Sequence, residues 1–561
     1  MNSHNQIYSV MFGGQAGDGV REAGVNFGRL LTKLGYSVVV TADYQSLIRG
    51  GRNSTTITFS DSEVYSDYST VDVLVGFNVE AITVHQSEVK SSGIIFFDNG
   101  DKAITPIKNI IGLPIAQTAK AVGAVPIMRS AFILGALCQY FNLPLASLEQ
   151  IFTEVFKERA KLNIVLAKEG FNFLKHLSLK TINLPTPKFK NNNLLSGNQA
   201  SSEGLMKAGL NIYVAYPMTP ASAIQEYLAE KAKTKKIKVV QLESELAVIN
   251  MALGSAYTGT KTAIGSSGGG FDLMQEGFSL AGMSEIPLVV LEVQRPGPST
   301  GVPTYTSQAD LAFVRSAGHG EFVRVILAPG DVEETYLLSA LAMNLAWQYQ
   351  IPVIVLTDKQ VGESFFSVNL PTTEVKPGTI KRWSGKGEYL RYALTKDGVS
   401  PLAFPGTANA VVKVNSYEHD ELGLSTEEAG LVQAMQDKRF AKLSTLAQEK
   451  FPRLKISGDK QADTAVIFWG STKGAIMEAN KYLTKSLRLI QVLCLEPFPK
   501  TEFLQAIKGA KKIVVVEGNH TGQLANLIQE QTGTMITNRI LRYDGRAFDA
   551  QVLARELTKK F

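Results

Sequence analysis

The sequence contains little cysteine. Only Cys138 and Cys494 occur in 561 residues, far apart and each within an apolar segment. An iron–sulfur cluster is typically held by four cysteine thiolates, so this chain cannot hold one by itself. A free cysteine in an apolar segment usually packs as a small hydrophobic side chain. We therefore expect two structural thiols in a protein of the reducing cytoplasm.

Long apolar runs and basic tracts are also missing. Apolar runs such as IPLVVLEV, residues 286–293, are far shorter than the ~20 residues that cross a bilayer. The opening residues MNSHNQ have neither the basic nor the apolar region of a secretion signal. No lysine- and arginine-rich tract with interleaved aromatic residues occurs, and the net charge of +6 is small for this length. These absences argue against a membrane protein, a secreted protein and a nucleic-acid partner.

What the chain does have is an alternation of strand-like β-branched runs with amphipathic helices. Hydrophobic residues make up 45% and charged residues 19% of the sequence, as in a packed globular protein. The alternation predicts an α/β fold with three parallel-sheet domains, each sheet covered by helices on both faces. The predicted division is a first domain over 1–183, a linker over 184–200, a second domain over 201–425, a connecting helix over 426–459 and a third domain over 460–561.

Local patterns support this division. Two prolines and a run of three asparagines interrupt the alternation between Leu184 and Ala200, which is typical of a linker. Residues 367–425 show no clear periodicity and are expected to be irregular. Ser425 and Glu428 have the spacing of a capping box, which predicts that the connecting helix begins at Ser425.

The glycine-rich stretch GGQAGDGVREAG, residues 13–24, follows a predicted strand and precedes a predicted helix that ends at Gly35. Its first glycines are spaced G-x-x-x-G-x-G, whereas a dinucleotide-binding turn needs G-x-G-x-x-G. NAD binding is therefore disfavoured, and Asp43 is expected to be a capping or surface residue.

The same stretch contains GDG at residues 17–19, the first half of a motif that holds Mg²⁺ and thiamine diphosphate. The second half is missing from ADYQSLIRGGRNS, residues 42–54. Because a hard cation needs further oxygen ligands, we predict no metal site in this chain. Binding of another anion at the helix N-terminus remains open.

Polar side chains recur at strand-to-helix junctions of the second predicted domain. YPMTPAS, residues 216–222, follows a strand and offers Thr219, and ligands bind at the carboxyl ends of strands in α/β sheets. The next junction places Glu243 and Glu245 at the start of a helix. Two carboxylates there have a simple alternative interpretation, which is helix capping.

A third junction, QRPGPSTGVPT at residues 294–304, begins with a lone arginine after an apolar strand. Arg295 is followed by Ser299, Thr300, Thr304 and Gln308 in a loop fixed by glycine and proline. A guanidinium with several hydroxyl groups suits a small carboxylate, which it binds through paired hydrogen bonds. The alternative for Arg295 is a structural salt bridge.

These motifs together resemble a known family. YPMTPAS, ESELA, SSGGGFDLMQEG, QRPGPSTGVPT and YEHDELG occur in the order and spacing of the α subunit of 2-oxoacid:ferredoxin oxidoreductases. GGQAGDG and LIRGGRNS look like the signature of the γ domain that some members carry fused at the N-terminus. The resemblance covers essentially the whole chain. It implies a γ-type domain, a pyrimidine-binding domain for thiamine diphosphate and a transketolase C-terminal-like domain.

The resemblance also implies an activity. Members of the family cleave a 2-oxoacid oxidatively with coenzyme A, which gives an acyl-CoA, CO₂ and reduced ferredoxin. Thiamine diphosphate, its Mg²⁺ and a [4Fe-4S] cluster would be held mainly by a separate β subunit, through which ferredoxin is reduced, in an (αβ)₂ heterotetramer. The motifs favour a 2-oxoglutarate:ferredoxin oxidoreductase. A pyruvate- or broad-specificity subunit, a self-contained transketolase-type enzyme and a non-catalytic assembly paralogue remain alternatives.

The family's cofactor-binding roles transfer to two of the motifs. Glu245 matches the catalytic glutamate that pairs with N1′ of the aminopyrimidine and favours its imino tautomer, with Glu243 in support. Thr219 would contact the reactive end of the cofactor or the substrate, and Tyr216 and Pro217 belong to the same cofactor-binding motif.

The substrate-binding roles fall on the third junction. Arg295 would hold the substrate carboxylate, with Thr304 as a second contact. His419 in YEHDELG matches a family motif to which the sequence assigns no role, and ordering of its own loop is the simplest interpretation.

Overall fold

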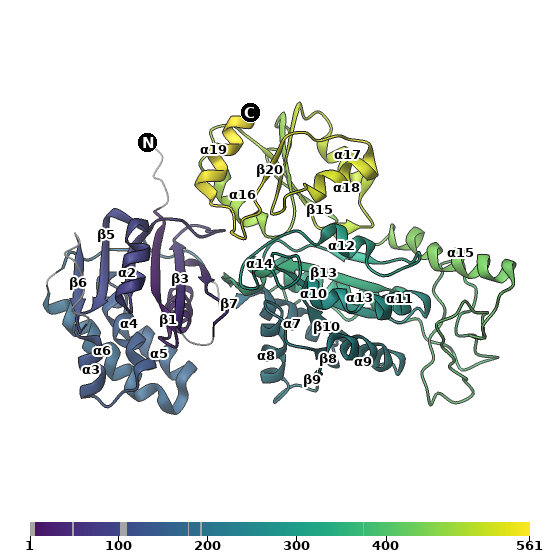
Figure 1. Cartoon of the computed structure of the whole chain (residues 1–561), viewed down its shortest axis with the longest axis horizontal. Helices are drawn as coiled ribbons and strands as arrows, with labels where there is room; N and C mark the ends of the chain where they lie inside the picture. The colour runs from purple at the N-terminus through teal and green to yellow at the C-terminus, as the bar shows by residue number, and fades with distance from the viewer. Residues whose placement is uncertain (1–5, 48–49, 101–108, 178, 191–192, 374) are drawn as a thin grey trace. The chain divides into compact units, whose positions relative to one another are not determined.

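The computed structural model describes residues 6–47, 50–100, 109–177, 179–190, 193–373 and 375–561. These residues fall into two compact units, one within 1–196 and 364–369, the other within 197–363 and 370–561. The first unit contains one sheet of eight strands, and the second contains a sheet of seven and a sheet of five (Figure 1). The α/β class is confirmed for all three sheets.

The first sheet is parallel in only one half. Its order is β6-β5-β4-β1-β3-β2-β14-β7. Its strands are β1 (Tyr8–Ala16), β2 (Ser37–Asp43), β3 (Gly50–Ser60), β4 (Val71–Gly76), β5 (Val89–Asp98), β6 (Ile110–Leu113), β7 (Asn193–Ser196) and β14 (Phe365–Val368). Strands β1, β4, β5 and β6 are parallel, whereas every pairing in the other half is antiparallel. This corrects the expectation of a wholly parallel sheet. Residues 44–49, which join β2 to β3, are too few for the crossover of about a dozen residues that a parallel pair needs.

The described residues of this unit form six α-helices. They are α1 (Val20–Leu34), α2 (Val79–His85), α3 (Ile115–Ala121), α4 (Arg129–Tyr140), α5 (Leu145–Phe156) and α6 (Ala160–His176). Helix α1 ends at Gly35 with a φ of 93°, which confirms the predicted glycine C-cap. Helices α4 and α6 pack backbone to backbone, because a Cβ at Gly135 or at Gly170 would lie 1.9 Å from a carbonyl oxygen of the other helix. Cys138 on α4 is free and buried, as expected of a structural thiol.

Residues 184–200, predicted to be a linker, also make contacts with the first unit and contribute a strand to its sheet. The Tyr36 hydroxyl donates to the Pro185 carbonyl, the Phe189 N–H donates to the Gly35 carbonyl, and β7 forms the edge of the sheet. Asn191 and Asn192 of the predicted linker lie outside the described residues, as do Ile48 and Arg49 of the LIRGGRNS motif.

The seven-stranded sheet has the order β18-β12-β13-β11-β10-β8-β9. Its strands are β8 (Ile212–Ala215), β9 (Lys238–Gln241), β10 (Thr262–Ser266), β11 (Leu288–Gln294), β12 (Val325–Leu327), β13 (Pro352–Asp358) and β18 (Cys494–Glu496). All pair in parallel except β18, which comes from the third predicted domain. Its helices are α7 (Gly197–Lys207), α8 (Ser222–Lys231), α9 (Glu245–Tyr257), α10 (Gly268–Asp272), α11 (Gln275–Met283), α12 (Leu311–Ser316), α13 (Val332–Tyr349) and α14 (Lys359–Glu363).

The five-stranded sheet has the order β15-β17-β16-β19-β20 and is parallel except at β15. Its strands are β15 (Leu454–Gly458), β16 (Thr464–Phe468), β17 (Arg488–Val492), β19 (Lys512–Glu517) and β20 (Arg539–Leu541). Its helices are α16 (Thr472–Asn480), α17 (Lys500–Ile507), α18 (Gln523–Thr532) and α19 (Ala550–Lys560). Phe468, Ile476 and Leu553 are central to its core. Cys494, on the neighbouring β18, is also free and buried.

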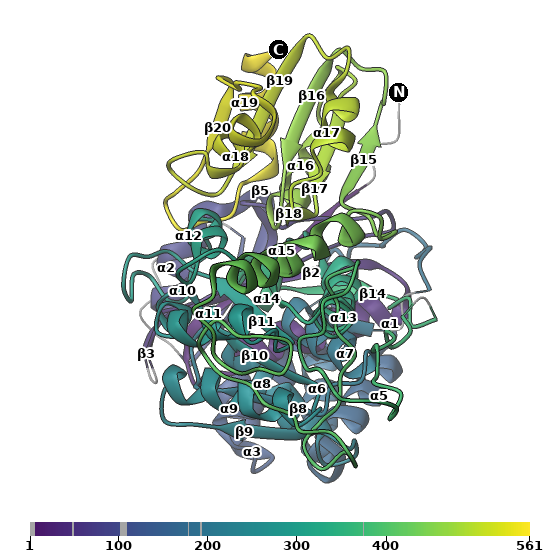
Figure 2. The ribbon, with the colours of Figure 1, turned by 90° about the vertical axis from the view of Figure 1, so that its right-hand side faces the viewer.

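The connecting helix α15 (Ala429–Leu446) begins later than the capping box predicts. Ser425 instead pairs with His419 in an isolated β-bridge, and the Thr426 N–H donates to the Glu418 carbonyl. The Glu428 side chain makes no capping hydrogen bond. The described residues between 370 and 428 form no helix or strand, as expected, and this irregular segment and α15 lie beside the seven-stranded sheet (Figure 2).

Within the described ranges, every helix is too short or too polar to cross a membrane. No three His, Cys, Asp or Glu side chains of the described residues are grouped so that they could hold a metal ion.

Candidate active site

The predicted site residues lie at one edge of the seven-stranded sheet. Strands β8, β10 and β11 are parallel neighbours, so their carboxyl ends point the same way. The segments that follow them contain YPMTPAS, the triple glycine at the start of α10, and RPGPST. Glu245 joins them from the start of α9, after β9. The parallel order thus brings together segments that are up to about ninety residues apart in the chain, which is the usual place for a ligand in such a sheet.

Glu245 is buried but does not cap its helix. Ser244 is the N-cap residue, and its hydroxyl accepts a hydrogen bond from the Ala247 N–H. The Glu245 side chain is only 3% exposed, and its Oε1 has no hydrogen-bond partner among the described residues. A buried carboxylate oxygen without a partner costs free energy, so this oxygen is suited to a partner from outside the chain. Glu243, by contrast, is exposed.

The triple glycine makes room for this carboxylate. A Cβ at Gly270 would lie 2.4 Å from Glu245 Oε1 and 2.1 Å from Ser266 Oγ, so no other residue fits at this backbone position. The Ser267 hydroxyl beside it is also buried and unpartnered among the described residues. The start of α10 is therefore built around unused polar atoms.

Arg295 ties the loop after β11 to the loop after β8. Its NH1 donates to the Thr219 carbonyl at 2.6 Å, and both residues are half-buried. Burial lowers the pKa of the Arg295 guanidinium, and its acidic neighbours Asp310 and Glu292 act in the opposite direction. Tyr216 and Pro217 are exposed at the same edge.

Two other residues of the loop that follows β11, here called the arginine loop (residues 295–310), do not lie beside Thr219 as Arg295 does. Thr304 is buried, with 3% of its surface exposed. Gln308, which the sequence places among possible substrate contacts, is used elsewhere. Its Oε1 accepts from the Gly518 N–H at 2.7 Å, and its Nε2 donates to the Trp469 carbonyl at 2.8 Å. It therefore fastens the loop to the carboxyl ends of β16 and β19 in the five-stranded sheet.

Two acids near Arg295, Glu292 and Asp310, were not predicted from the sequence. Glu292 lies on β11 and is fully buried, and Asp310 is the N-cap residue of α12. Burial raises the pKa of Glu292 well above its usual range and that of Asp310 to about 6. An acidic residue inside the apolar strand LVVLEVQ is the one signal in the sequence that pointed to this pair.

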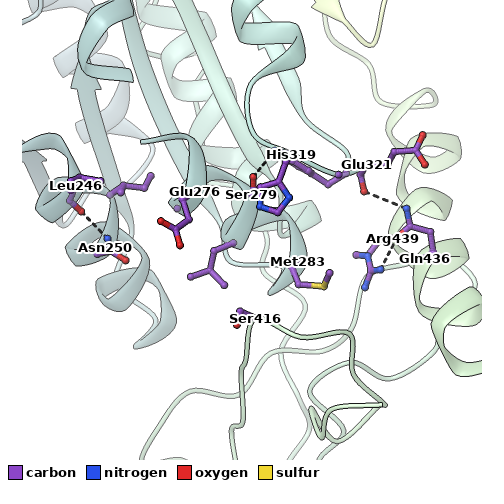
Figure 3. Close-up of a pocket in the computed structure, with 15 residues that line it drawn as sticks. Leu246, Asn250, Glu276, Ser279, Met283, His319, Glu321, Ser416, Gln436 and Arg439 are labelled. Carbon is purple, nitrogen blue, oxygen red and sulfur yellow. Dashed lines mark hydrogen bonds between the residues drawn. The ribbon is translucent and has the colours of Figure 1, made fainter. Parts of the chain in front are cut away.

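A cavity of about 450 Å³ is lined by residues of α9, α11 and α15 (Figure 3). Leu246, the neighbour of Glu245, is one of its lining residues. Figure 3 shows two hydrogen bonds at this cavity: the His319 N–H donates to the Ser279 hydroxyl, and Gln436 on α15 donates to the Glu321 carbonyl. Leu246 and Leu273 are each 50% exposed in this chain. Apolar side chains that stand in water beside a site are typical of an interaction surface.

His419 is fully buried rather than part of the sheet edge. Its Nδ1–H donates to the Tyr417 carbonyl at 2.9 Å, and its ring lies 3.7 Å from the Tyr392 ring between centroids. Burial lowers its pKa. These contacts are those of a residue that orders its own loop.

The aspartate of the glycine-rich motif, Asp18, accepts a hydrogen bond within its own loop. Asp18 Oδ2 accepts a hydrogen bond from the Gln15 N–H at 2.9 Å, so this carboxylate already has a partner within the loop. The motif borders a cavity of about 240 Å³, with Arg21 and Asn53 among its lining residues. Asp43 is exposed, as expected of a surface residue.

Two family models match the chain. One, described as "Pyruvate ferredoxin/flavodoxin oxidoreductase", matches residues 9–173, and the other, "Pyruvate flavodoxin/ferredoxin oxidoreductase, thiamine diP-bdg", matches residues 203–438. The second match contains Thr219, Glu245 and Arg295. Fold, site and models together define the class: an oxidoreductase subunit with a thiamine-diphosphate-binding domain.

Relatives identify the family within that class. The chain is 32% identical to a 2-oxoacid:ferredoxin oxidoreductase subunit alpha from Sulfolobus sp, over 98% of this chain and 96% of the relative. It is 30% identical to the 2-oxoglutarate synthase subunit KorA from Methanothermobacter marburgensis, over 62% of this chain and 93% of the relative. The chain therefore belongs to the family of 2-oxoacid:ferredoxin oxidoreductase α subunits, which confirms the resemblance of its motifs.

A solved structure covers the entire fold. The 2-oxoglutarate:ferredoxin oxidoreductase from Magnetococcus marinus, with 2-oxoglutarate, coenzyme A and succinyl-CoA bound, is 29% identical with a TM-score of 0.91. The alignment covers 99% of this chain and 100% of that chain. The γ-type region, the pyrimidine-binding-like region and the C-terminal region thus occur together in one known protein.

Proposed function

We propose that this chain is the γ-fused α subunit of a 2-oxoglutarate:ferredoxin oxidoreductase. The reaction converts 2-oxoglutarate and coenzyme A to succinyl-CoA and CO₂, and the electron pair released passes to ferredoxin. The observation that carries this proposal is the buried Glu245 carboxylate within the thiamine-diphosphate-type domain, whose Oε1 has no hydrogen-bond partner among the residues that the structure describes. The substrates bound in the Magnetococcus marinus structure support the choice of 2-oxoglutarate.

The residues at the sheet edge fit thiamine diphosphate. Glu245 Oε1 offers an unused acceptor, and Gly270 leaves space beside it. When bound, the cofactor supplies a carbon nucleophile and an electron sink for loss of CO₂ from the 2-oxoacid. Glu245 would hold a proton between its carboxyl group and a pyrimidine ring nitrogen, and a preorganised hydrogen bond in a water-excluded pocket is strong. Thr219, Tyr216 and Pro217 would line the cofactor.

Arg295 would bind the carboxylate of the substrate. One of its N–H groups is already fixed on the Thr219 carbonyl, which orients the guanidinium and leaves further donors for a carboxylate. Thr304, in the same loop, would add a second contact. This chain's part in the reaction is therefore to hold the substrate and to keep one proton in place at the cofactor.

A β subunit would complete the enzyme. We assign to it the diphosphate group, Mg²⁺, the [4Fe-4S] cluster and the contact with ferredoxin, within a cytoplasmic (αβ)₂ heterotetramer. The two cysteines here are buried, and Asp18 is bonded within its own loop, which supports this division of labour. The cavity beside α9 and the exposed Leu246 and Leu273 would face that subunit.

We also propose functional boundaries within this chain. The γ-type domain would comprise residues 1–183, the pyrimidine-binding domain 201–425 and the transketolase C-terminal-like domain 460–561. The ranges matched by the two family models support the first two.

The experiment is reconstitution with the β subunit. The purified complex is given thiamine diphosphate, Mg²⁺ and coenzyme A, and reduction of ferredoxin is followed with 2-oxoglutarate, pyruvate or 2-oxobutyrate. We expect the highest kcat/KM with 2-oxoglutarate. Equal values for all three would favour an enzyme of broad 2-oxoacid specificity instead. An assembled complex that reduces ferredoxin with none of them would refute the proposal.

A further inference from the structure

Gln308 joins the arginine loop to the five-stranded sheet with its side chain and its backbone. The side chain accepts from the Gly518 N–H at 2.7 Å and donates to the Trp469 carbonyl at 2.8 Å. The backbone N–H donates to the Gly518 carbonyl at 2.8 Å, and the backbone carbonyl accepts from Asn519 Nδ2 at 3.1 Å. Gln308 is 1% exposed. Each of its polar groups is therefore used in this buried contact.

The part of the chain that Gln308 contacts is itself held in place by buried hydrogen bonds. Asn519 Nδ2 also donates to Glu517 Oε2 at 2.9 Å, and Asn519 Oδ1 accepts from the Gly522 N–H at 2.8 Å. Glu517, at the end of β19, is fully buried and accepts from the Leu524 N–H on α18 at 2.7 Å. Gln308 is thus bound to a fixed point of the five-stranded sheet.

The rest of the arginine loop is tied by backbone hydrogen bonds along its length. The Val302 N–H donates to the Pro296 carbonyl at 3.0 Å, and the Tyr305 N–H donates to the Val302 carbonyl at 3.2 Å. The Thr306 N–H then donates to the carbonyl of Gly545, which follows β20, at 3.1 Å. These bonds make the loop compact, so a displacement at one end is passed to the other.

Arg295 lies at the opposite end of this loop from Gln308. One donor of its guanidinium is fixed on the Thr219 carbonyl at 2.6 Å. A guanidinium is planar, and it binds a carboxylate through paired hydrogen bonds only when its plane is correctly oriented. The direction in which the Arg295 side chain leaves the backbone depends on the loop, and the loop is held by the five-stranded sheet.

We propose that Gln308 is a positioning residue through which the five-stranded sheet holds Arg295 in the orientation that binds the substrate carboxylate. This inference rests on the proposed role of Arg295 in substrate binding. The polar groups of Gln308 are all bonded within the chain, so it acts through Arg295 and not on the substrate. The C-terminal sheet thereby contributes to substrate affinity without touching the 2-oxoacid.

Gln523 on α18 offers a matched control. Its Nε2 donates to the Ala309 carbonyl at 2.7 Å, and its Oε1 accepts from the Ala312 N–H at 2.9 Å. It therefore joins the same two parts of the chain as Gln308 does. Its contacts lie beyond Gln308 along the chain, at the start of α12 and farther in sequence from Arg295. A merely structural contact between the two sheets would be weakened by substitution at either glutamine.

The test measures KM and kcat of the reconstituted complex for 2-oxoglutarate. Gln308→Met and Gln523→Met each keep the side-chain volume and remove the hydrogen bonds of the amide. We expect Gln308→Met to raise KM by about threefold to tenfold, the equivalent of one net hydrogen bond, with kcat changed by less than about twofold. Gln523→Met should leave KM unchanged.

A double variant shows whether Gln308 acts through Arg295. If it does, Arg295→Ala combined with Gln308→Met should have the KM of Arg295→Ala alone, because the group that Gln308 positions is then missing. Gly518→Ala disturbs the same contact from the other side, since a Cβ there would lie 3.2 Å from Gln308 Cγ. It should raise KM as well, and it serves as the second variant if Gln308→Met does not fold.

The contrary outcomes are distinct from one another. An unchanged KM in Gln308→Met, or in Gly518→Ala where Gln308→Met does not fold, would overturn the positioning role. So would an equal rise in KM for Gln308→Met and Gln523→Met, or effects that multiply in the double variant, since both indicate a merely structural contact. If the proposed function is wrong, the unsubstituted complex turns over no 2-oxoacid.

Discussion

Among single side chains, Glu245 is expected to lower the stability of the protein and to be needed for its activity. Its buried Oε1 has no hydrogen-bond partner among the described residues, which costs stability, yet the same oxygen is what an aminopyrimidine would need. We expect Glu245→Gln to lower 2-oxoacid-dependent activity at least about 100-fold, because one preorganised catalytic hydrogen bond contributes that much. Thermal unfolding should show equal or greater stability.

The matched control for Glu245 is Glu243→Gln, two residues away and exposed. It should retain most of the activity. If Glu245→Gln assembles with the β subunit and is fully active, Glu245 has no part in the mechanism.

Arg295 is expected to act on substrate binding. Replacing it with alanine removes a charge-assisted contact worth about 2–3 kcal/mol, which corresponds to a rise of roughly 30- to 150-fold in KM for the 2-oxoacid. Arg295→Lys keeps the charge but loses the planar guanidinium that makes paired hydrogen bonds. Its KM should therefore lie between that of the unsubstituted enzyme and that of Arg295→Ala. Steady-state kinetics at saturating coenzyme A measure both. An unchanged KM in Arg295→Ala would assign Arg295 to a structural salt bridge.

The sequence predicted Thr219, Glu245 and Arg295 each at the end of a strand, and the carboxyl ends of parallel strands meet at one edge of a sheet. It did not predict the partners of these residues. Asp310 returns to β11 because its N–H donates to Gln294, a contact without any local signal in the sequence. Gln308 was misjudged for the same reason, since its partners Gly518 and Trp469 lie more than a hundred residues away.

At the scale of helices and strands, α15 is joined to the rest of its unit by a buried ion cluster. Glu285 Oε1 lies 2.6 Å from the Lys438 ammonium and its Oε2 lies 2.5 Å from that of Lys442, and all three side chains are almost fully buried. Arg391 donates to the Glu285 carbonyl. The cations, after the opposing effect of burial, hold the pKa of Glu285 well below its usual range.

Removing the acid from this cluster leaves cations buried without a counter-charge. We expect Glu285→Gln to cost about 3–5 kcal/mol and to detach α15, with faster proteolysis between residues 370 and 428. Lys442→Met leaves one acid opposite one lysine and should cost much less. Equal unfolding temperatures and cleavage rates for the two variants would show that the cluster does not hold the helix.

The start of α15 also shows why a correct local motif can fail. Ser425 and Glu428 have the spacing of a capping box, but the Ser425 backbone is engaged by His419 in a β-bridge before the helix begins. Likewise, the sequence predicted parallel sheets, but the connection between β2 and β3 is too short for a parallel pair, and these two strands are antiparallel. Element types follow from periodicity, whereas their ends and directions follow from contacts and connection lengths.

For the chain as a whole, the proposed division of labour predicts what it does alone. Purified without the β subunit, the protein should bind thiamine diphosphate weakly and show no iron–sulfur absorbance near about 400 nm. Addition of the β subunit should restore cofactor binding, measured by calorimetry, together with 2-oxoglutarate-dependent ferredoxin reduction. A brown protein that is active alone would contradict the two-subunit enzyme.

The bond between Gln308 and the five-stranded sheet has an evolutionary consequence. A Cβ at Gly470 would lie 2.7 Å from Gln308 Nε2, and one at Gly518 would lie 3.2 Å from its Cγ. A side chain at either glycine would therefore push against the loop that begins at Arg295. We expect Gln308, Gly470 and Gly518 to vary together among related chains, and an alignment in which they change independently would speak against this coupling. Substrate preference in this family would then be inherited jointly by two segments that are widely separated in the gene.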